Sequence, residues 1–452
     1  MVSGKNPTTS GMMCFMGRVV ETGGMGRASA NGNPGHAIRI FDLPFRGERI
    51  DRHQTSARNP MHILMVAPEP IFEPRGTPFS VVGRLKALSD MGHMVDLATY
   101  PLGGDVTFPG LRVFRTPPIP GIRKIKIGPS AAKLPLDFCL MILTLIRLIR
   151  RRYDLIHTHE EAGFWGTVFS RCFGIPHVYD MHSSLPQQLR NFEFSKSVWL
   201  HRLFVSIERW MLKYASAVIT ICPDLYDQVK RQSPDRGSVL IENVIDYAEV
   251  FGAVCDPGQI QNRHALRGKC VALYTGTFEP YQGLDLLIQS AEIVLRKHPE
   301  VLFLLVGGHP DQVRQYEASV RSRKIEKQVV LTGQVPPHEI PAYMACSHLL
   351  LSPRISGTNT PLKIYSYLRS GIPVVATRIL THTQVLDDSV AELTDPTPSA
   401  FAAGMLRVLE DPAHAKRLTR NAAALSERKY STAVYLEKFR KTLALALERG
   451  IS

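Results

Sequence analysis

The chain has 452 residues, more than one hydrophobic core normally organises, so two or more domains are expected. Its formal net charge of +14 favours negatively charged binding partners: nucleic acid, acidic membrane surfaces or phosphorylated small molecules. Seven cysteines, an odd number without a Cys-x-x-Cys pair, argue against a disulfide framework and against a zinc site. Composition therefore predicts a globular protein of a reducing compartment, which we expect to be the cytoplasm.

Residues 1–60 differ from the rest of the chain. They are rich in Gly, Ser, Asn and Met and lack helical or strand periodicity, so we predict a disordered N-terminal extension. No basic start leads into an apolar block of signal-peptide length, and export is not expected. Met61 directly precedes the first predicted strand and would also suit the start of the protein.

From Met61 onward, apolar runs of strand length alternate with amphipathic helical stretches, which is typical of a parallel sheet covered by helices on both faces. One helix keeps Val81, Val82, Leu85, Leu88 and Met91 on one side and ends at Gly92. Strands are predicted at residues 62–69, 94–100, 153–159, 177–183 and 217–222, and again at 270–276, 301–308, 329–335, 348–353 and 372–377.

These two series predict an α/β fold of two Rossmann-like, doubly wound domains at residues 61–250 and 269–430. Residues 251–268 break the rhythm with polar and turn residues and are predicted to be an interdomain linker. Ligands of such sheets bind beyond the carboxyl ends of the strands, so two facing sheets would form a cleft.

The segment "SPRISGTNTPLKIYSYLRSGIPVVAT", residues 352–377, combines a strand end, a polar loop and a helix. Thr360 is a good N-cap and Pro361 suits the first helical position. Free backbone N–H groups at a helix start, with Arg354 and Lys363 nearby, favour an anion, and a diphosphate would fit. The alternative is an ordinary strand, loop and helix, with both cations solvated.

Loop, helix and "GIPVVAT" together resemble the donor-binding segment of retaining glycosyltransferases of family 4, enzymes of the GT-B fold that use nucleotide sugars. The resemblance extends over nearly all of residues 61–445. Other stretches that carry it are "LIENVIDYAEVF", "YTGTFEPYQGLDLLIQSA", "LTGQVPPHEIPAYMACSHLLLSP" and "YSTAVYLEKFRKTLALAL". It implies that residues 61–250 bind the acceptor, that residues 269–430 bind the donor, and that a terminal helix at residues 431–452 crosses back to the first domain.

The sequence also departs from this family. The two glutamates usual there are replaced by Ser356, near the sugar-facing position, and Ser366, at the ribose position. A serine can hydrogen-bond a ribose hydroxyl but lacks the charge-assisted strength of a carboxylate. The usual arginine and lysine are likewise missing, at about Thr277 and Gln282. We expect Arg354 and Lys363 to neutralise the phosphates instead, and the predicted donor-binding set is Gly76, Thr77, Thr277, Gln282, Arg354, Ser356, Thr358, Asn359, Thr360, Lys363 and Ser366.

In the first domain, Gly76 and Thr77 belong to a predicted loop where the missing side chain of Gly76 would let backbone approach a phosphate, unless the loop is an ordinary connection. His182 and Asp180 stand at a strand end and are the predicted catalytic residues, because the resemblance implies that His182 contacts the donor sugar. His159 and Glu160, at another strand end, are acceptor-side candidates. His157 alternates to the opposite face.

No Asp-x-Asp motif and no cluster with metal-ligand spacing occurs in the sequence, so neither a metal nor a cofactor is expected. The resemblance implies retaining, metal-independent transfer of a hexosyl unit from a UDP- or GDP-type sugar to a glycan or lipid-linked acceptor, in surface polysaccharide biosynthesis. Another enzyme on the same scaffold, or a non-catalytic or acceptor-dependent partner in polysaccharide assembly, is the alternative. Nucleic acid ranks last, since no aromatic-interleaved basic motif accompanies the charge.

Residues 121–154 bear on the acceptor. Their apolar stretch, Phe138–Ile149, is too short to span a bilayer. Basic residues crowd both ends, which favours peripheral association with anionic lipid on the cytoplasmic face of the membrane. A buried helix with an exposed basic end is the alternative. The basic residues are Arg123, Lys124, Lys126, Arg150, Arg151 and Arg152.

Overall fold

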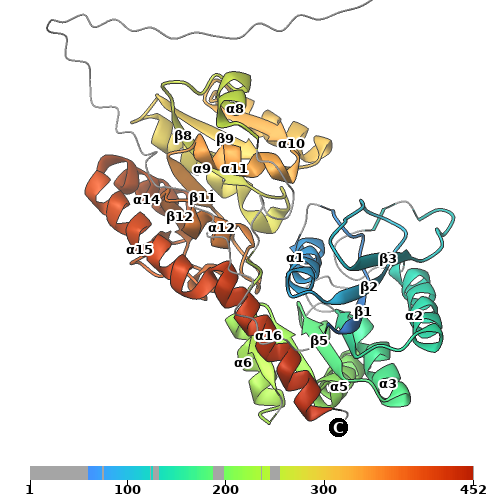
Figure 1. The fold of residues 1–452 in the computed structure, drawn as a ribbon. Coiled ribbons are helices and arrows are strands. Elements are labelled where there is room, and N and C mark those ends of the chain that lie inside the picture. Colours follow the sequence, from blue (N-terminus) through green and yellow to red (C-terminus); the bar gives the residue numbers. More distant parts are fainter. Residues whose placement is uncertain are drawn as a thin grey trace, which may run out of the picture. The chain divides into compact units, whose positions relative to one another are not determined.

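The protein is described by a computed structural model that covers residues 60–73, 76–122, 124–125, 132–186, 198–235, 237–244 and 255–450. Apart from Pro60, the predicted N-terminal extension lies outside the described residues. Within them, the chain forms two sheets in which every strand pairing is parallel (Figure 1). This confirms the α/β fold predicted from the alternation of strand and helix patterns.

The first sheet has seven strands in the order β3-β2-β1-β4-β5-β6-β7. Its strands are β1 (His62–Ala67), β2 (Met94–Thr99), β3 (Leu111–Arg115), β4 (Leu155–His159), β5 (His177–Met181), β6 (Ala217–Thr220) and β7 (Ser238–Leu240). The helices of this half are α1 (Gly76–Asp90), α2 (Lys133–Arg150), α3 (Ala162–Phe173), α5 (Val198–Tyr214) and α6 (Pro223–Gln232). Helix α1 packs on one face, and α2 and α3 on the other, so the central strands are buried on both faces.

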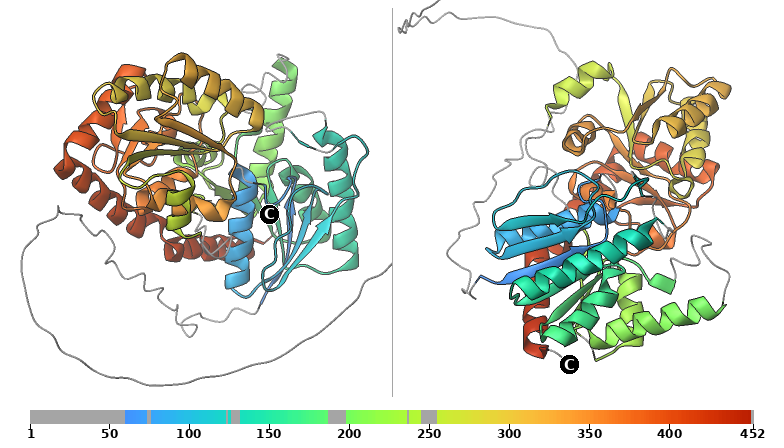
Figure 2. Two further views of the ribbon diagram at one scale, coloured as in Figure 1. Left: turned by 90° about the horizontal axis from the view of Figure 1, so that it is seen from above. Right: turned by 90° about the vertical axis from the view of Figure 1, so that its right-hand side faces the viewer.

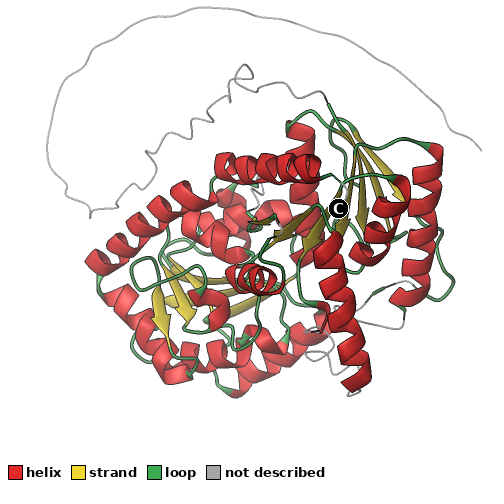
Figure 3. Cartoon of the chain, turned by 90° about the horizontal axis from the view of Figure 1, so that it is seen from below, coloured by secondary structure: helices red, strands yellow, loops and turns green. Residues whose placement is uncertain are grey.

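The second sheet has six strands in the order β10-β9-β8-β11-β12-β13. They are β8 (Cys270–Thr275), β9 (Val301–Val306), β10 (Val329–Gly333), β11 (Leu349–Ser352), β12 (Val374–Thr377) and β13 (Glu392–Thr394). One face is covered by α9 (Leu284–Leu295), α10 (Pro310–Ser322) and α14 (Pro398–Glu410), and the other by α8 (Pro257–Arg263), α11 (Ile340–Ala345), α12 (Lys363–Arg369) and α15 (Pro412–Tyr430). Figure 3 shows these helices flanking the strands. Shorter helices are η1 (Pro280–Gln282), η2 (Pro337–Glu339) and α13 (Leu380–Thr383).

Each sheet reverses its strand order once, between β1 and β4 in the first and between β8 and β11 in the second. At such a point the loops leave the sheet in opposite directions, and a crevice opens beyond the strand ends. The topology therefore indicates where a ligand would bind before any side chain is considered.

Three local features differ from the predictions. Helix α8 lies in the segment 251–268, predicted to be a linker, and its Ile260 is buried in the core of the second sheet. Helix α1 already begins at Gly76, so Gly76 and Thr77 form its first turn rather than a loop. The strands β3, β7 and β13 were not predicted. Strands β7 and β13 have three residues each, and the apolar residues of β3 (LRVFR) are interrupted by arginines, so none shows a continuous apolar run.

The last helix, α16 (Thr432–Arg449), follows α15 of the second sheet but packs against the first sheet (Figures 1 and 2). Tyr435, Leu436 and Phe439 point into the core that α1 also covers. The helix thus ties the end of the chain to the first sheet by apolar burial, a non-directional force that grows with the area removed from water. Among the described residues, no helix is both long enough and apolar enough to cross a bilayer.

Phe439→Ala is expected to lower the free energy of unfolding by about 3–5 kcal/mol, because a fully buried ring is removed from a packed core. Urea unfolding followed by circular dichroism measures the change. Lys441→Ala, at an exposed position of the same helix, is the matched control and should cost less than about 0.5 kcal/mol. Equal midpoints for the two variants would contradict the packing of α16 on the first sheet.

Candidate functional site

A cavity of about 1050 Å³ is lined by residues from both sheets. The lining residues follow β1, β4 and β5 in the first half of the chain and β8, β9, β10 and β11 in the second. All of these are carboxyl ends of parallel strands, the position where ligands bind in this architecture. The volume lies at the upper end of the range typical for small-molecule sites.

Most of the predicted site residues line this cavity. They are Gly76, Thr77, Glu160, His182, Thr277, Gln282, Arg354, Ser356, Thr358, Asn359, Thr360 and Lys363. Asp180, His159 and Ser366 do not line it; all three side chains are buried. The structure therefore brings the two halves of the prediction together, with Asp180 and His159 set behind His182.

The loop after β11 is wrapped around the guanidinium of Arg354. Its Nε donates to the carbonyl oxygen of Ser356 at 2.8 Å, and its Nη1 donates to that of Asn359 at 3.2 Å. Gly357 has a φ of +121°, and a Cβ there would lie 2.4 Å from Nη2 of Arg354. Only glycine fits this turn, because other residues add both strain and a clash.

Helix α12 begins later than predicted. Its first residue is Lys363 and its N-cap is Leu362, so the prediction of Thr360 as N-cap and Pro361 as first helical residue is wrong. The side-chain amide of Asn359 donates to the carbonyl oxygen of His182 at 2.8 Å, and this contact holds the loop against the first half of the chain. A tertiary hydrogen bond thus overrides the local capping preference, and the seven-residue helix is not the basis of an anion site.

The side chains of Arg354 and Lys363 make this end of the cavity positively charged. Nζ of Lys363 donates to the carbonyl oxygen of Thr275 at 2.9 Å and lies 3.8 Å from the centre of the Tyr274 ring. Among the described residues, no carboxylate lies within ion-pair distance of Lys363 or Arg354. Burial lowers the pKa of Lys363 well below its usual range, with a further contribution from Arg354, and burial also lowers the pKa of Arg354. Two partly buried cations without a counter-ion make this a site for an anion.

Two glycines that the sequence analysis did not single out, Gly276 and Gly307, line the cavity near Lys363. Gly276 has a φ of +145°, and a Cβ there would lie 3.4 Å from Nζ of Lys363. A Cβ on Gly307 would lie 1.8 Å from the carbonyl oxygen of Gly276. Both residues line the cavity, and both directly follow a buried strand, which is the signal that could have identified them.

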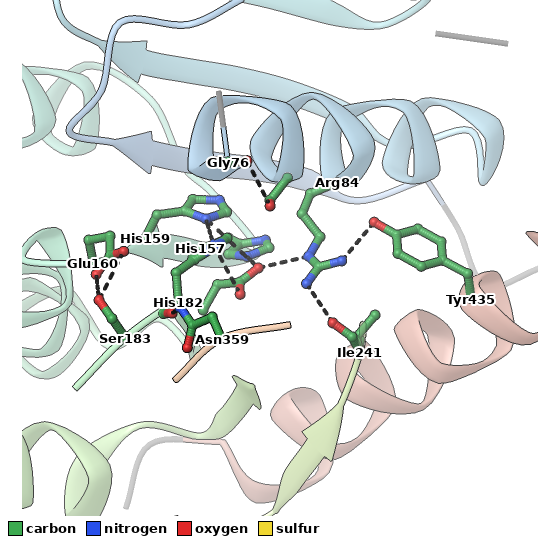
Figure 4. A network of polar contacts seen from close by, with 12 residues as sticks. Gly76, Arg84, His157, His159, Glu160, His182, Ser183, Ile241, Asn359 and Tyr435 are labelled. Carbon is green, nitrogen blue, oxygen red and sulfur yellow. Dashed lines mark hydrogen bonds and ion pairs between the residues drawn. The ribbon is translucent and has the colours of Figure 1, made fainter. Parts of the chain in front are cut away.

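On the first sheet, His182 lies against a buried polar cluster (Figure 4). Its Nε2 is 3.0 Å from Nδ1 of His159 and 3.3 Å from Oδ1 of Asp180. Burial lowers the pKa of His182 to about 4, against the attraction of Asp180. Burial alone would raise the pKa of Asp180, but Arg84 and the histidines outweigh it and hold that pKa well below its usual range. A neutral imidazole beside an ionised carboxylate is the result.

The same cluster has the spacing of a metal site, because ligand atoms of His157, His159 and Asp180 lie within 4.8 Å of one another. The sequence pattern did not predict this cluster. The carboxylate of Asp180 is already paired with the guanidinium of Arg84, at 2.8 Å. A metal ion would add a second positive charge in a buried place, which low polarity makes costly. These residues therefore fit a metal poorly.

The opposite wall is rich in carboxylates. Glu69, Glu160 and Glu161 line the cavity, as does Lys133, which pairs with Glu161. Ser183 donates to Glu160 at 3.1 Å, and Glu160 has a φ of +48° that is rare outside glycine. Burial raises the pKa of Glu160 well above its usual range, and the neighbouring Glu161 and Glu69 raise it further. The cavity is thus acidic on one side and basic on the other.

Comparisons with known proteins agree with this geometry. Residues 259–425 match the family model of glycosyl transferases group 1, and residues 80–243 match the glycosyl transferase 4-like domain. A 2-deoxystreptamine glucosyltransferase of Streptomyces kanamyceticus is 25% identical over 358 residues, 73% of this chain and 88% of that protein. An alpha-D-kanosaminyltransferase of the same organism is 23% identical over 299 residues, 63% of this chain and 75% of that protein.

Solved structures resemble the chain in fold. A sucrose-phosphate synthase from Thermosynechococcus elongatus superposes with a TM-score of 0.67 at 19% identity and covers 85% of this chain and 98% of its own. Anabaena HepE in complex with UDP-glucose has a TM-score of 0.64 at 18% identity and covers 85% of this chain and 99% of its own.

Lys363→Met is expected to stabilise the protein without ligand, by on the order of 1 kcal/mol at pH 7. A lysine whose pKa is lowered by folding binds its proton more weakly in the folded state, so it destabilises the fold below its unfolded pKa. The advantage of the variant should shrink as the pH rises towards about 10.4, where the unfolded lysine also loses its proton. Urea unfolding between pH 7 and pH 10 measures it. A variant less stable than the wild type throughout would contradict an uncompensated charge at this position.

Proposed function

The chain belongs to the family 4-like glycosyltransferases of the GT-B fold and is an enzyme of that class, and from this premise we propose its substrates and chemistry. The donor is a nucleoside-diphosphate sugar of UDP or GDP type. A hexosyl unit passes from it, with retained anomeric configuration and without a metal ion, to a glycan or lipid-linked acceptor in surface polysaccharide biosynthesis.

The observation that carries the donor proposal is the pair of cations at the cavity wall. Arg354 and Lys363 have no carboxylate partner among the described residues, and a diphosphate would supply the missing negative charge. Solved structures of the same fold contain such ligands: HepE contains UDP-glucose, and an E. coli protein, covering 85% of this chain at a TM-score of 0.62 and 11% identity, contains UDP-2-fluoro glucose. Gln334 and Val335 also line the cavity, where the base would lie.

In this arrangement, positive charge stabilises the leaving diphosphate. Charge develops on the phosphate oxygens as the sugar departs, and fixed cations in a site shielded from water stabilise that charge strongly. Lys363 and Arg354 are held by carbonyl oxygens of their own domain, so they need little reorganisation when the donor binds. His182 lines the opposite wall, where it would contact the sugar, and the wall around Glu160 would face the acceptor.

Serines replace the two glutamates that the resemblance implies, so a non-catalytic role is the alternative to test. Ser356 lines the cavity and Ser366 is buried; these are the two positions at which the resemblance implies glutamates. A protein that binds nucleotide but does not transfer sugar would be a non-catalytic or acceptor-dependent partner in polysaccharide assembly. Binding and turnover must therefore be measured separately.

Thermal unfolding with UDP, GDP, ADP and their sugars at millimolar concentration is expected to give one selective shift. A ligand at a hundredfold excess over its Kd stabilises by about 2.7 kcal/mol if it binds only the folded state. Lys363→Met should fold and lose most of this shift. Lys441→Ala, on the exposed face of α16, should keep it in full. No shift with any nucleotide, from a wild-type protein that unfolds cooperatively, would contradict a donor site formed without acceptor and would favour an acceptor-dependent donor site or a non-catalytic partner.

Turnover is followed by 1H NMR of the released sugar or glycoside, with the protein and the nucleotide sugar selected by binding. Slow donor hydrolysis is expected even without an acceptor, because the cavity admits water when the acceptor is absent. The anomer formed first reports retention or inversion. Nucleotide binding with neither transfer to extracts containing lipid-linked glycans nor hydrolysis would favour the non-catalytic alternative.

Helix α2 supports the proposal of a membrane-associated acceptor. Its inward face buries Leu136, Leu140, Thr144 and Leu148. A second stripe, spaced by three or four residues along its outer face, is exposed and apolar, and it consists of Leu134, Phe138, Ile142, Ile146 and Ile149. Exposed basic residues follow directly at Arg150, Arg151 and Arg152, whereas Arg123 and Lys126 lie outside the described residues. An apolar stripe ending in basic residues suits an anionic lipid surface.

The stripe also leads to the cavity. Lys133, the first residue of α2, lines the cavity wall, and the helix extends about 27 Å from there. A lipid-linked acceptor lying along α2 would present its glycan at the acidic side of the cavity. This geometry connects membrane association with acceptor choice.

Leu134→Ser combined with Phe138→Ser is expected to weaken binding to vesicles of phosphatidylglycerol and phosphatidylcholine at least tenfold, since each side chain gains about 1.5–3 kcal/mol on full burial. Vesicle co-sedimentation at two salt concentrations measures it. Leu380→Ser, which removes a half-exposed leucine from α13, is the control and should bind like the wild type. Equal loss in all variants, or no binding by the wild type, would contradict docking through α2.

A further inference from the structure

Arg84 is a fully buried arginine whose guanidinium joins three parts of the chain. From α1, its Nε donates to Oδ2 of Asp180 at 2.8 Å, its Nη1 to the hydroxyl of Tyr435 at 2.8 Å, and its Nη2 to the carbonyl oxygen of Ile241 at 3.1 Å. Figure 4 shows dashed contacts from the guanidinium to Tyr435 and Ile241. The planar fork of arginine can satisfy three acceptors at once, which lysine cannot do in the same geometry.

The carboxylate of Asp180, held by Arg84, lies next to two histidines. Oδ2, which accepts from Arg84, is also 3.4 Å from Nε2 of His157, while Oδ1 is 3.3 Å from Nε2 of His182. Burial alone would raise the pKa of Asp180, but Arg84 and the neighbouring histidines together hold it well below its usual range, so the carboxylate stays ionised. The orientation of one negative charge next to His182 therefore depends on Arg84.

The contact between His159 and His182 requires one ring nitrogen to donate and the other to accept. Both rings are neutral at pH 7, because burial lowers the pKa of each. If Nε2 of His182 carries the proton, it donates to Nδ1 of His159, and the proton also lies near the negative charge of Oδ1 of Asp180, 3.3 Å from Nε2 and without a hydrogen-bond partner of its own among the described residues. If it carries a lone pair, that lone pair faces the carboxylate at 3.3 Å and is repelled. The electrostatics favour the Nε2–H form.

In that form, Nδ1 of His182 holds a lone pair. This nitrogen is buried and has no hydrogen-bond partner among the residues that the structure describes, although His182 lines the cavity. Buried polar atoms are nearly always partnered in folded proteins, so an unpartnered one beside a cavity indicates a hydrogen bond made to a ligand. The hydroxyl of a sugar would supply the donor.

We propose that Arg84 is a positioning residue for His182: it holds Asp180 so that the carboxylate fixes the Nε2–H tautomer, which leaves Nδ1 to accept a hydrogen bond from a hydroxyl of the donor sugar. Tyr435 joins this network to α16, the helix that follows α15 of the second sheet. The identity of the ligand hydroxyl rests on the proposed function, whereas the tautomer is a property of the protein alone.

A different Arg–Asp pair in the same domain provides the matched comparison. Nη2 of Arg147 donates to Oδ2 of Asp96 at 2.8 Å, and Asp96 is as buried as Asp180. Neither residue lines the cavity. Asp96 also accepts from Arg112 and Tyr153 and lies 3.5 Å from Nε2 of His62, which does not line the cavity. Loss of Arg147 should therefore affect stability and leave His182 unchanged.

The test is long-range 1H–15N NMR of the full chain with 15N-labelled histidine at pH 7, with His182→Gln used to assign the ring. In the wild type, Nε2 of His182 is expected to be protonated and Nδ1 to show the shift of a bare nitrogen. Arg84→Met should give a mixture of tautomers. Arg147→Met should leave the His182 signals unchanged. A protonated Nδ1 in the wild type, or an unchanged tautomer in Arg84→Met, would overturn the proposal.

Two further variants keep the test decisive if Arg84→Met does not fold. Tyr435→Phe removes one hydroxyl and should partly release the tautomer, and Arg84→Lys keeps the charge but not the three bonds. If both retain the wild-type tautomer, Arg84 is a structural residue only. The tautomer needs no substrate, so it distinguishes failure of this inference from failure of the proposed function.

Kinetics supply the second readout. Arg84→Met is expected to lower kcat/KM up to about a hundredfold, because a displaced group near the reacting centre can cost that much. The Kd for the nucleotide alone should be unchanged, because Arg354 and Lys363 belong to the other sheet. Weaker nucleotide binding in proportion to the loss of kcat/KM would indicate general damage to the fold and would contradict a positioning role.

Discussion

Parallel pairing of every strand is the constraint on which the rest of this structure depends. A parallel connection needs a crossover, and the crossover helices cover both faces of each sheet while all carboxyl ends meet at one edge. Residues far apart in the chain therefore share a cavity: the side chain of Asn359, after β11, reaches the carbonyl oxygen of His182, after β5, at 2.8 Å. The site is a consequence of topology, and its loops are free to carry chemistry.

The charges of the cavity are arranged at a cost to the fold. Lys363 and Arg354 are half-buried and held only by carbonyl oxygens and aromatic faces, while Glu160 is buried on the opposite wall with a backbone conformation that is rare for its type. Burial disfavours the charged form of each of these groups. Such strain persists only where the surrounding structure enforces it, and it is what a preformed site for a charged substrate requires.

Helices α16 and α2 pack on opposite faces of the first sheet. Helix α16 buries Tyr435 and Phe439 under the sheet and contributes a hydroxyl to the cluster around Arg84. Helix α2, on the other face, buries one side and exposes an apolar stripe that ends in basic residues. One sheet thus supports both an inner polar network that includes His182 and an outer apolar stripe with basic residues at its end.

The sequence by itself determined the α/β class, ten of the described strands and several of the loops around the cavity, because hydrophobic periodicity and loops after buried strands are local signals. Only the tertiary structure decided the edge strands β3, β7 and β13, the start of α12 after Thr360, and the membership of α8 in the second core. The same holds for the contacts that join Arg84 to Asp180 and Tyr435, and Asp180 to His157. These residues are separated by up to 351 positions, and their shared burial and charge exist only once the strands and α16 have packed.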